Sequence, residues 1–303
     1  MGKILVVGSL AYDSLTTPAG KVQRVLGGSA NYFAMSASLF APVQVVGVVG
    51  DDYQSEHKQM LVNRGVDVKG IEHVRGKTFH WEGAYGNDLN EAKSLKTELN
   101  VFEYFHPKLP SGFDSSEYVF LANIDPILQA EVLAQISKPK LIVADTMNFW
   151  IQTKILDLSA MLKRIHILLI NEGEAKQLTQ TSNAVAAAEK IVEMGPKSVV
   201  IKRGEYGFLL YSMGKCFALP AYPLKTVIDP TGAGDTFAGG FMGYLAKFDL
   251  AGNLGALKMA SVYGTLMASF TVQDFGLRAL ESLTMNQFER RHLEFREIVS
   301  VNV

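Results

Sequence analysis

Short apolar runs alternate with longer amphipathic stretches along most of the chain. Each run has the continuous apolar character of a strand that is buried on both faces of a parallel sheet. The runs cover residues 4–7, 43–49, 118–124, 141–144, 165–170 and 198–201. The stretches between them have the length and end signals of helices, and they cover residues 30–40, 53–64, 127–136, 151–163 and 184–194. The alternation predicts an α/β fold with a doubly wound, mostly parallel sheet, helices on both faces and a ligand site at the carboxyl ends of the strands.

Two segments do not follow this alternation. Residues 15–25 and 71–105 have the pattern of short amphipathic strands joined by turns. We interpret them as a small β-lid, formed by about residues 13–26 and 71–106, on a single domain that spans residues 1–303. A pair of surface hairpins is the alternative. A terminal amphipathic helix is predicted over residues 283–295.

The composition favours a small molecule as the partner. The 303 residues include 29 Lys and Arg against 30 Asp and Glu, so the formal net charge is −1. This balance predicts no binding of nucleic acid or of acidic membrane surfaces. No signal peptide or membrane span is predicted, and a cytoplasmic location is expected. The one cysteine, Cys216, lies in an apolar run and is expected to be an inert core thiol.

The strongest chemical signal is the sequence DPTGAGDTFAGGF at residues 229–241. An apolar helix is predicted from residue 238 onward, so the glycine-rich part falls at a helix N-terminus. Free backbone N–H groups and the helix dipole form an anion site there, and glycines let the backbone approach an anionic ligand closely. The pattern lacks the lysine of a Walker A loop and the third glycine of a dinucleotide fingerprint.

Asp235 stands inside this cradle. A carboxylate in that place can accept a proton from an alcohol, while the amides of Gly232, Ala233 and Gly234 stabilise a phosphoryl group under attack. The helix dipole is expected to keep Asp235 ionised. The alternative is that Asp235 only caps the helix and that the glycines only permit tight packing.

The sequence at residues 229–241 resembles the C-terminal motif of the ribokinase-like (PfkB) family of carbohydrate and nucleoside kinases. A second stretch, GGSAN at residues 27–31 followed by VVGVVGDD at residues 45–52, resembles the N-terminal motif of that family. The resemblance extends over nearly the whole chain. It implies a ribokinase-like fold with a β-lid, and transfer of the γ-phosphoryl group of ATP to a substrate hydroxyl.

The resemblance also assigns expected binding residues. Those matching the acceptor site of the family are Asp13, Gly27, Gly28 and Asn31, although Ala11 stands where the family commonly has Asn. Those matching the nucleotide site are Asn171, Lys202, Gly204, Gly207 and Thr231, and Lys202 replaces a common Thr. Glu174 matches the acidic position that helps to hold Mg²⁺, which prefers oxygen ligands and keeps most of its waters.

The expected activity is therefore an ATP- and Mg²⁺-dependent kinase acting on a hydroxymethyl group of a small sugar. A nucleoside of the adenosine type is the first alternative acceptor, because the aromatic residues Phe79, Trp81 and Tyr85 of the β-lid can present a flat apolar surface to a base. A non-catalytic sugar-binding relative is the second alternative. The sequence leaves open whether a monovalent cation such as K⁺ activates the protein and whether it forms a homodimer through the β-lid.

Overall fold

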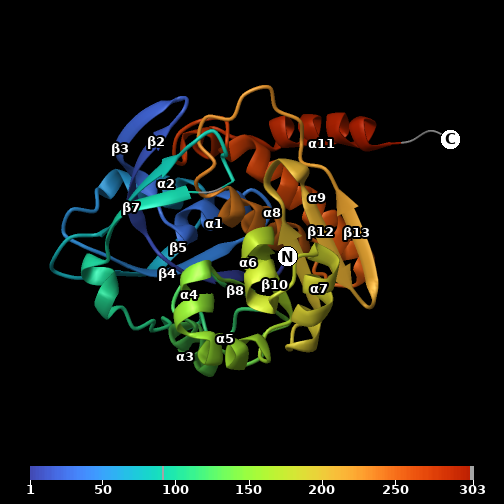
Figure 1. Ribbon diagram of the computed structural model, residues 1–303. Coiled ribbons are helices and arrows are strands. Elements are labelled where there is room, and N and C mark those ends of the chain that lie inside the picture. Colours follow the sequence, from blue (N-terminus) through green and yellow to red (C-terminus); the bar gives the residue numbers. More distant parts are fainter. Residues whose placement is uncertain (91, 301–303) are drawn as a thin grey trace.

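The structure is a computed structural model that describes residues 1–90 and 92–300. Within these residues the strands form a large sheet and a small sheet (Figure 1). From edge to edge, the strands of the large sheet are β5 (Asp67–His73), β4 (Val43–Val49), β1 (Ile4–Val7), β8 (Tyr118–Leu121), β9 (Leu141–Asp145), β10 (Ile167–Asn171), β11 (Ser198–Lys202), β12 (Phe208–Ser212) and β13 (Lys215–Leu219). The strands from β5 to β11 are parallel, and β12 and β13 continue the sheet as an antiparallel hairpin.

Helices cover both faces of the large sheet. One apolar core joins the sheet to α1 (Ser29–Ala37), α2 (Ser55–Asn63), α8 (Ala233–Lys247), α9 (Leu254–Thr271), α10 (Arg278–Glu281) and α11 (Met285–Val299). The other core joins it to α3 (Pro126–Gln135), α4 (Asn148–Thr153), α5 (Ile155–Leu162), α6 (Glu172–Thr179) and α7 (Ala184–Glu193). The central strand β1 shows why the strands read as continuous apolar runs, because Ile4 and Val6 enter the first core while Leu5 and Val7 enter the second. The predicted doubly wound α/β fold is confirmed.

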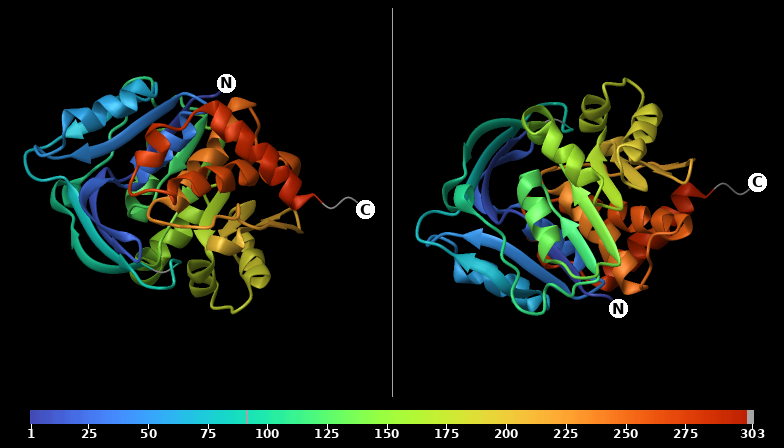
Figure 2. Two further views of the ribbon diagram at one scale, coloured as in Figure 1. Left: turned by 90° about the horizontal axis from the view of Figure 1, so that it is seen from above. Right: turned by 90° about the horizontal axis from the view of Figure 1, so that it is seen from below.

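The small sheet has the strand order β3 (Gly20–Gly27), β2 (Ala11–Thr17), β6 (Phe79–Tyr85) and β7 (Ala92–Glu98). Strands β2 and β6 are parallel and form its centre, with an antiparallel partner on each side. Seen from above and below, this sheet lies on the side of the molecule opposite the C-terminal helix α11 (Figure 2).

Three details differ from the sequence prediction. The segment 71–106 is divided, because β5 joins the large sheet and residues Asn100–Tyr104 form a short 3₁₀ helix, η1. The helix expected over residues 151–163 is two helices, α4 and α5, because Lys154 has φ −136° and ψ 41°, outside the helical region. Cys216 is exposed on the edge strand β13, so the expectation of a core thiol is wrong.

Among the described residues, no helix is both long enough and apolar enough to cross a lipid bilayer.

Candidate active site

The segment 229–235 forms a tight turn into α8. Asp229 holds the turn, since one carboxylate oxygen accepts a bond from the Thr231 N–H (2.9 Å) and the other from the Gly276 N–H (3.1 Å). Gly232 precedes the helix with φ +72°, and a Cβ atom at this position would lie 2.4 Å from the ring of Tyr32. Only glycine fits both the left-handed backbone and this close contact.

The turn leaves donors free at the start of α8. The Ala233 N–H donates to the Pro230 carbonyl (3.2 Å) within the turn. In residues 1–90 and 92–300, the N–H groups of Gly232, Gly234 and Asp235 have no hydrogen-bond acceptor outside their own residue. These amides and the positive end of the helix dipole fit an anionic group such as a phosphate.

Asp235 lies in the first turn of α8, and its pKa is raised to about 7. Burial is the main cause and the negative charge of Asp145 adds to it, whereas Lys202 acts in the opposite direction. Burial and the second carboxylate therefore act against the helix dipole, which was expected to keep this carboxyl ionised. A carboxyl with a pKa near 7 is well matched to general base catalysis.

Lys202 is the last residue of β11, and its side chain reaches the start of α8. Its Nζ atom donates to Oδ2 of Asp145, at the end of β9, over 2.8 Å. Both side chains are largely buried, with 16% and 6% of their surface exposed. The Lys202 Nζ atom would also lie 3.0 Å from a Cβ atom on Gly234, so the ammonium group sits beside the amides of the cradle.

Asn171 and Glu174 form a capping box at the start of α6. The Glu174 N–H donates to the Asn171 side chain (2.7 Å), and the Asn171 N–H donates to the Glu174 carboxylate (3.0 Å). The pKa of Glu174 is raised to about 7, mainly by burial and then by Asp145, while Lys202 opposes the shift. Glu174 therefore faces the same charged cluster, although its role as a helix cap is sufficient to explain the motif locally.

Asp13 lies on β2, and its carboxyl group interacts electrostatically with that of Asp235. A Cβ atom on Gly27 would lie 1.9 Å from the Asp13 carboxylate, so the glycine is required for this close approach. Burial raises the pKa of Asp13 to about 8, the charges of Asp229 and Asp235 add to the shift, and the N–H of Gly28 opposes it. The structure thus brings Asp13 and Asp235, 222 residues apart in the chain, into one electrostatic cluster.

Asn31 lies beside these residues on α1. Its Nδ2 atom donates to the Gly27 carbonyl (2.6 Å), while its buried Oδ1 atom has no partner among the described residues. Gly28 caps the same helix. The four residues that match the acceptor motif therefore converge on one wall of the site.

The small sheet reaches across this site in two places. The Thr231 hydroxyl donates to the Tyr85 phenol oxygen over 3.1 Å, which joins the end of β6 to the turn before α8. Beyond β6, a Cβ atom on Gly204 would meet Oδ1 of Asn90 at 1.6 Å, so the tip of the hairpin touches the turn after β11. Gly207 ends that turn and lies against the Leu219 carbonyl.

Two residues of this cluster have roles that the sequence did not predict, Tyr32 and Tyr85. Tyr85 was expected to offer a face for stacking and not a hydrogen bond. For Asp145 the sequence does carry a signal, because it follows a core strand and can line the path of the phosphates. Its place is the carboxyl end of a strand next to the strand that Asn171 ends. Nothing in the sequence pattern marks Tyr32.

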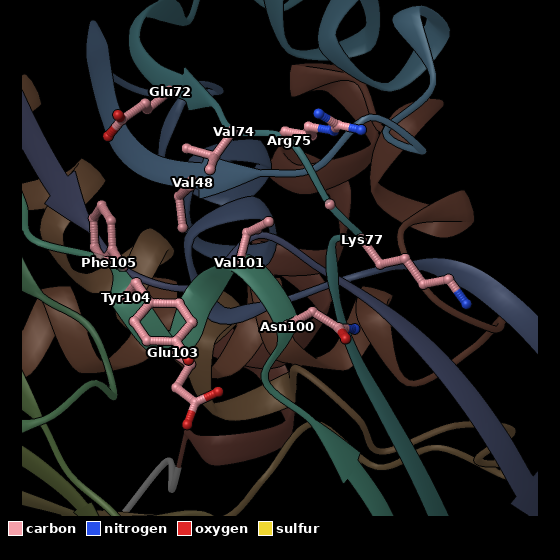
Figure 3. Close-up of a pocket in the computed structure, with 11 residues that line it drawn as sticks. Val48, Glu72, Val74, Arg75, Lys77, Asn100, Val101, Glu103, Tyr104 and Phe105 are labelled. Atoms are coloured by element: carbon pink, nitrogen blue, oxygen red, sulfur yellow. The ribbon is translucent and has the colours of Figure 1, made fainter.

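A separate cavity of about 390 Å³ lies between the two connections that lead into and out of the small sheet. Its lining comes from β5, from residues 74–77 and from η1. Figure 3 shows Val48, Val74 and Val101 grouped at its centre, while the charged ends of Arg75 and Lys77 point away from them. None of the residues expected from the sequence to act in catalysis lines this cavity.

Comparison with known proteins identifies the family of the chain. The model of the pfkB family of carbohydrate kinases matches residues 1–283. The cytidine kinase of Thermococcus kodakarensis is 31% identical over 246 residues, which are 79% of this chain and 87% of that protein.

Two solved structures show the same fold. The nucleoside kinase of Methanocaldococcus jannaschii has a TM-score of 0.76 at 20% identity, with 97% of this chain and 99% of that chain covered. The ribokinase of Cryptococcus neoformans, solved with ADP, has a TM-score of 0.77 at 22% identity, with 96% and 100% covered. The residues that match the family model include both sheets and the start of α8. The chain therefore belongs to the pfkB family of carbohydrate kinases.

Proposed function

We propose that the protein transfers the γ-phosphoryl group of ATP to the hydroxymethyl group of a nucleoside, with cytidine as the first candidate. One observation supports this most directly. Asp235 stands at a helix N-terminus with free amides, has a pKa raised to about 7, and shares a cluster with Asp13 of the opposite wall. This arrangement offers a base, an anion site and residues that can bind an acceptor in one cluster.

In the proposed reaction, Asp235 accepts the proton of the hydroxymethyl group as its oxygen attacks the γ-phosphorus. The new O–P bond forms while the bond from the γ-phosphorus to the bridging oxygen breaks, and that oxygen leaves with ADP. The amides of Gly232, Gly234 and Asp235 stabilise the charge on the transferring group. Asp13 and Asn31 orient the acceptor from the opposite wall.

The residues for the nucleotide fit an anionic, metal-bound phosphate chain. The N–H groups of Gly232, Gly234 and Asp235 that have no acceptor among the described residues can bind phosphate oxygens, and Lys202 brings a positive charge beside Gly234. Thr231 directly precedes Gly232, Asn171 is the register partner of Lys202 in the neighbouring strand, and Gly204 and Gly207 form the turn that follows Lys202. Glu174 would hold Mg²⁺ through water, and the ion supplies neutralisation of the phosphate charge when bound.

The face of the small sheet that carries Asp13 narrows the choice between a sugar and a nucleoside as the acceptor. Asp13 and Trp81 are register partners on β2 and β6, so their side chains lie on the same face, and Tyr85 follows on that face two pleats later. A sugar needs hydroxyl partners, whereas a base also needs a flat apolar surface. This face and the likeness to a cytidine kinase favour a nucleoside over the free sugar that the sequence alone suggested.

The deciding experiment is a phosphoryl-transfer assay with ATP and Mg²⁺ on cytidine, adenosine, inosine, ribose, fructose and 2-keto-3-deoxygluconate. Asp235→Asn, purified in the same way, is the matched blank for contaminating kinases. The variant keeps the outline of the side chain but cannot take the proton, so turnover should fall by about two to four orders of magnitude. Binding of a non-hydrolysable ATP analogue, measured by calorimetry, should survive because the amides remain.

Asp249→Asn is the control for the loss of an ordinary carboxylate. Asp249 lies beside Lys140 and Tyr118, outside the cleft, so this variant should keep its turnover. A wild-type protein that is inactive on all six acceptors, or an Asp235→Asn variant within tenfold of wild type, contradicts the proposed activity.

Two further expectations stay predictions. Activation by K⁺ is checked by turnover in K⁺ and Na⁺ at equal ionic strength. A homodimer through the small sheet is checked by the molar mass in solution, and Leu95 on its outer strand β7, with 51% of its surface exposed, is a suitable position for a disrupting charge.

A further inference from the structure

Tyr32 carries a buried hydroxyl group that the fold does not use. The residue lies on α1 and only 1% of its surface is exposed. In residues 1–90 and 92–300, its hydroxyl group has no hydrogen-bond partner. Burying a hydroxyl without a partner costs free energy, whereas phenylalanine would fill the same volume without that cost. An unused buried donor on a ring that packs against the turn into α8 therefore points to a ligand.

The surroundings of the phenol show where that ligand would be. The ring lies against the backbone of Gly232 at the cradle, as the position of a Cβ atom there demonstrates. The charges of Asp13, Asp229 and Asp235 act on the phenol and raise its pKa. Tyr32 thus stands between the wall that carries Asp13 and the base at the start of α8.

The phenol remains a donor in this setting. Burial raises its pKa well above the usual value and the surrounding carboxylates add to the shift, so it keeps its proton at neutral pH. Ionised carboxylates only accept hydrogen bonds. An acceptor hydroxyl that donates a hydrogen bond to a carboxylate still has lone pairs on its oxygen. A phenol on the opposite side can donate a hydrogen bond to that oxygen.

We propose that the Tyr32 hydroxyl binds the acceptor, by donating a hydrogen bond to a pentose hydroxyl whose own proton points to Asp13. The inference rests on the proposed function and adds a residue that selects for this hydroxyl. A bond from the substrate to Asp13 would also favour the ionised form of that buried carboxyl. Binding of the acceptor would then also give the buried Tyr32 hydroxyl its hydrogen-bond partner.

Tyr32→Phe removes only the hydroxyl group. The kcat/KM for the acceptor should fall about 10- to 100-fold, in line with loss of one buried hydrogen bond to a substrate. Affinity for a non-hydrolysable ATP analogue should stay within twofold of wild type. The melting temperature without ligands should be equal or higher, because the unpaired hydroxyl is gone.

Tyr118→Phe is the matched control. Tyr118 is also fully buried, but its hydroxyl donates to Asp249 (3.0 Å) at the amino end of β8, away from the cleft. This variant should show a lower melting temperature and an unchanged kcat/KM. The two substitutions therefore make opposite predictions for stability and activity.

Acceptors that lack the 2′- or the 3′-hydroxyl identify the bonded group. For the analogue that lacks it, Tyr32→Phe and wild type should differ by less than twofold, whereas the other analogue should keep the full difference. A kcat/KM for Tyr32→Phe equal to that of wild type overturns the inference, as does an equal loss on both analogues, which would mean that the Tyr32 hydroxyl binds neither the 2′- nor the 3′-hydroxyl. A wild type that phosphorylates no acceptor overturns the proposed function as well.

Discussion

Lys202 is a single cation among carboxylates from three other elements. Asp145 of β9 holds its ammonium group directly, and the charges of Glu174 on α6 and Asp235 on α8 also act on it. The three carboxylates and one ammonium leave this part of the site negative before a ligand binds. A cation that is buried, paired and next to the cradle can lower the pKa of the base Asp235 as well as contact a phosphate.

Lys202→Met should therefore change the pH profile of kcat/KM. Wild-type kcat/KM should rise with pH through about 7, because Asp235 must lose its proton to act as a base. Without Lys202 the attraction that lowers the Asp235 pKa is lost while Asp145 still repels, so the rising limb should move to higher pH. Turnover measured from pH 6 to 9 tests this.

Lys202→Arg is the control. It keeps the positive charge, so kcat/KM should rise over the same pH range as in wild type. If the limb of Lys202→Met coincides with that of wild type, Lys202 does not act on the base.

Trp81 has a partner on its own sheet. Its Nε1 atom donates to Ser94 (3.0 Å), and its ring lies over Gly83, where a Cβ atom would meet it at 2.2 Å. If the ring also stacks on a base, Trp81→Ala should raise the KM for a nucleoside about tenfold, in the range of one lost stacking contact, and leave the KM for ribose unchanged. Equal effects on both acceptors would mean that Trp81 only packs the small sheet.

At the scale of elements, the turn into α8 is the part of the site that the backbone determines. Gly232→Ala places a Cβ atom in a left-handed backbone and against the ring of Tyr32. We expect a loss of about 2–4 kcal/mol in the free energy of unfolding, from backbone strain plus overpacking. Turnover per folded molecule should also fall, since the amides of Gly234 and Asp235 follow directly.

Gly65→Ala separates the two causes. Gly65 has φ +75°, close to the value of Gly232, but a Cβ atom there meets nothing within 4 Å. Its cost should be limited to backbone strain, about 1–2 kcal/mol, with activity unchanged. Denaturant unfolding of both variants measures the difference, and equal losses would show that the contact with Tyr32 is unimportant.

The sequence was informative for elements whose burial pattern is uniform. Strands such as β1 and β4 were predicted with their observed bounds, because both faces of each strand are buried and the apolar run is unbroken. The edge strand β5 was taken for part of the lid, since an edge strand is half exposed and its pattern does not distinguish the two sheets.

The site was predictable only in part, for a similar reason. Glycines and Asp235 lie close together in the chain, and the helix N-terminus alone gives them a function. The pair of Asp145 and Lys202 joins residues 57 apart and depends on strands β9, β10 and β11 lying side by side. Tyr32 shows no sequence signal because its unusual property is a missing hydrogen bond, which only the packed structure reveals.

At the scale of the whole molecule, the site concentrates acidic groups that the near-neutral net charge conceals. The pKa values of Asp13, Asp235 and Glu174 are raised to about 8, 7 and 7, and burial is the main cause in each case. Between pH 4 and 8 each folded carboxyl holds protons that the unfolded chain has released. The folded state therefore loses stability as pH rises through this range, until each group is ionised in both states.

Asp13→Asn should remove the part of this loss of stability that the Asp13 carboxyl causes, which can be measured in the protein without ligands. The histidines His57, His166 and His292 have lowered pKa values and act in the opposite direction, since the unfolded chain binds their protons more strongly. Wild type and variant share these histidines, so the difference between their unfolding free energies isolates Asp13. That difference should favour the variant and grow as pH rises from 5 to 8, by at most about 1.4 kcal/mol per pH unit.

The measurement is denaturant unfolding of both proteins at several pH values, with turnover on the acceptor beside it. Asp13→Asn should be more stable at pH 8 than wild type and yet bind the acceptor poorly, because the carboxylate that costs stability is the one that orients the substrate. Asn keeps the close contact with Gly27, so packing changes little. A stability difference that does not change between pH 5 and 8 would show that the Asp13 carboxyl has the same pKa in the folded and unfolded protein. Ionisation of the buried Asp13 carboxyl would then carry no cost in the free energy of unfolding that acceptor binding could offset.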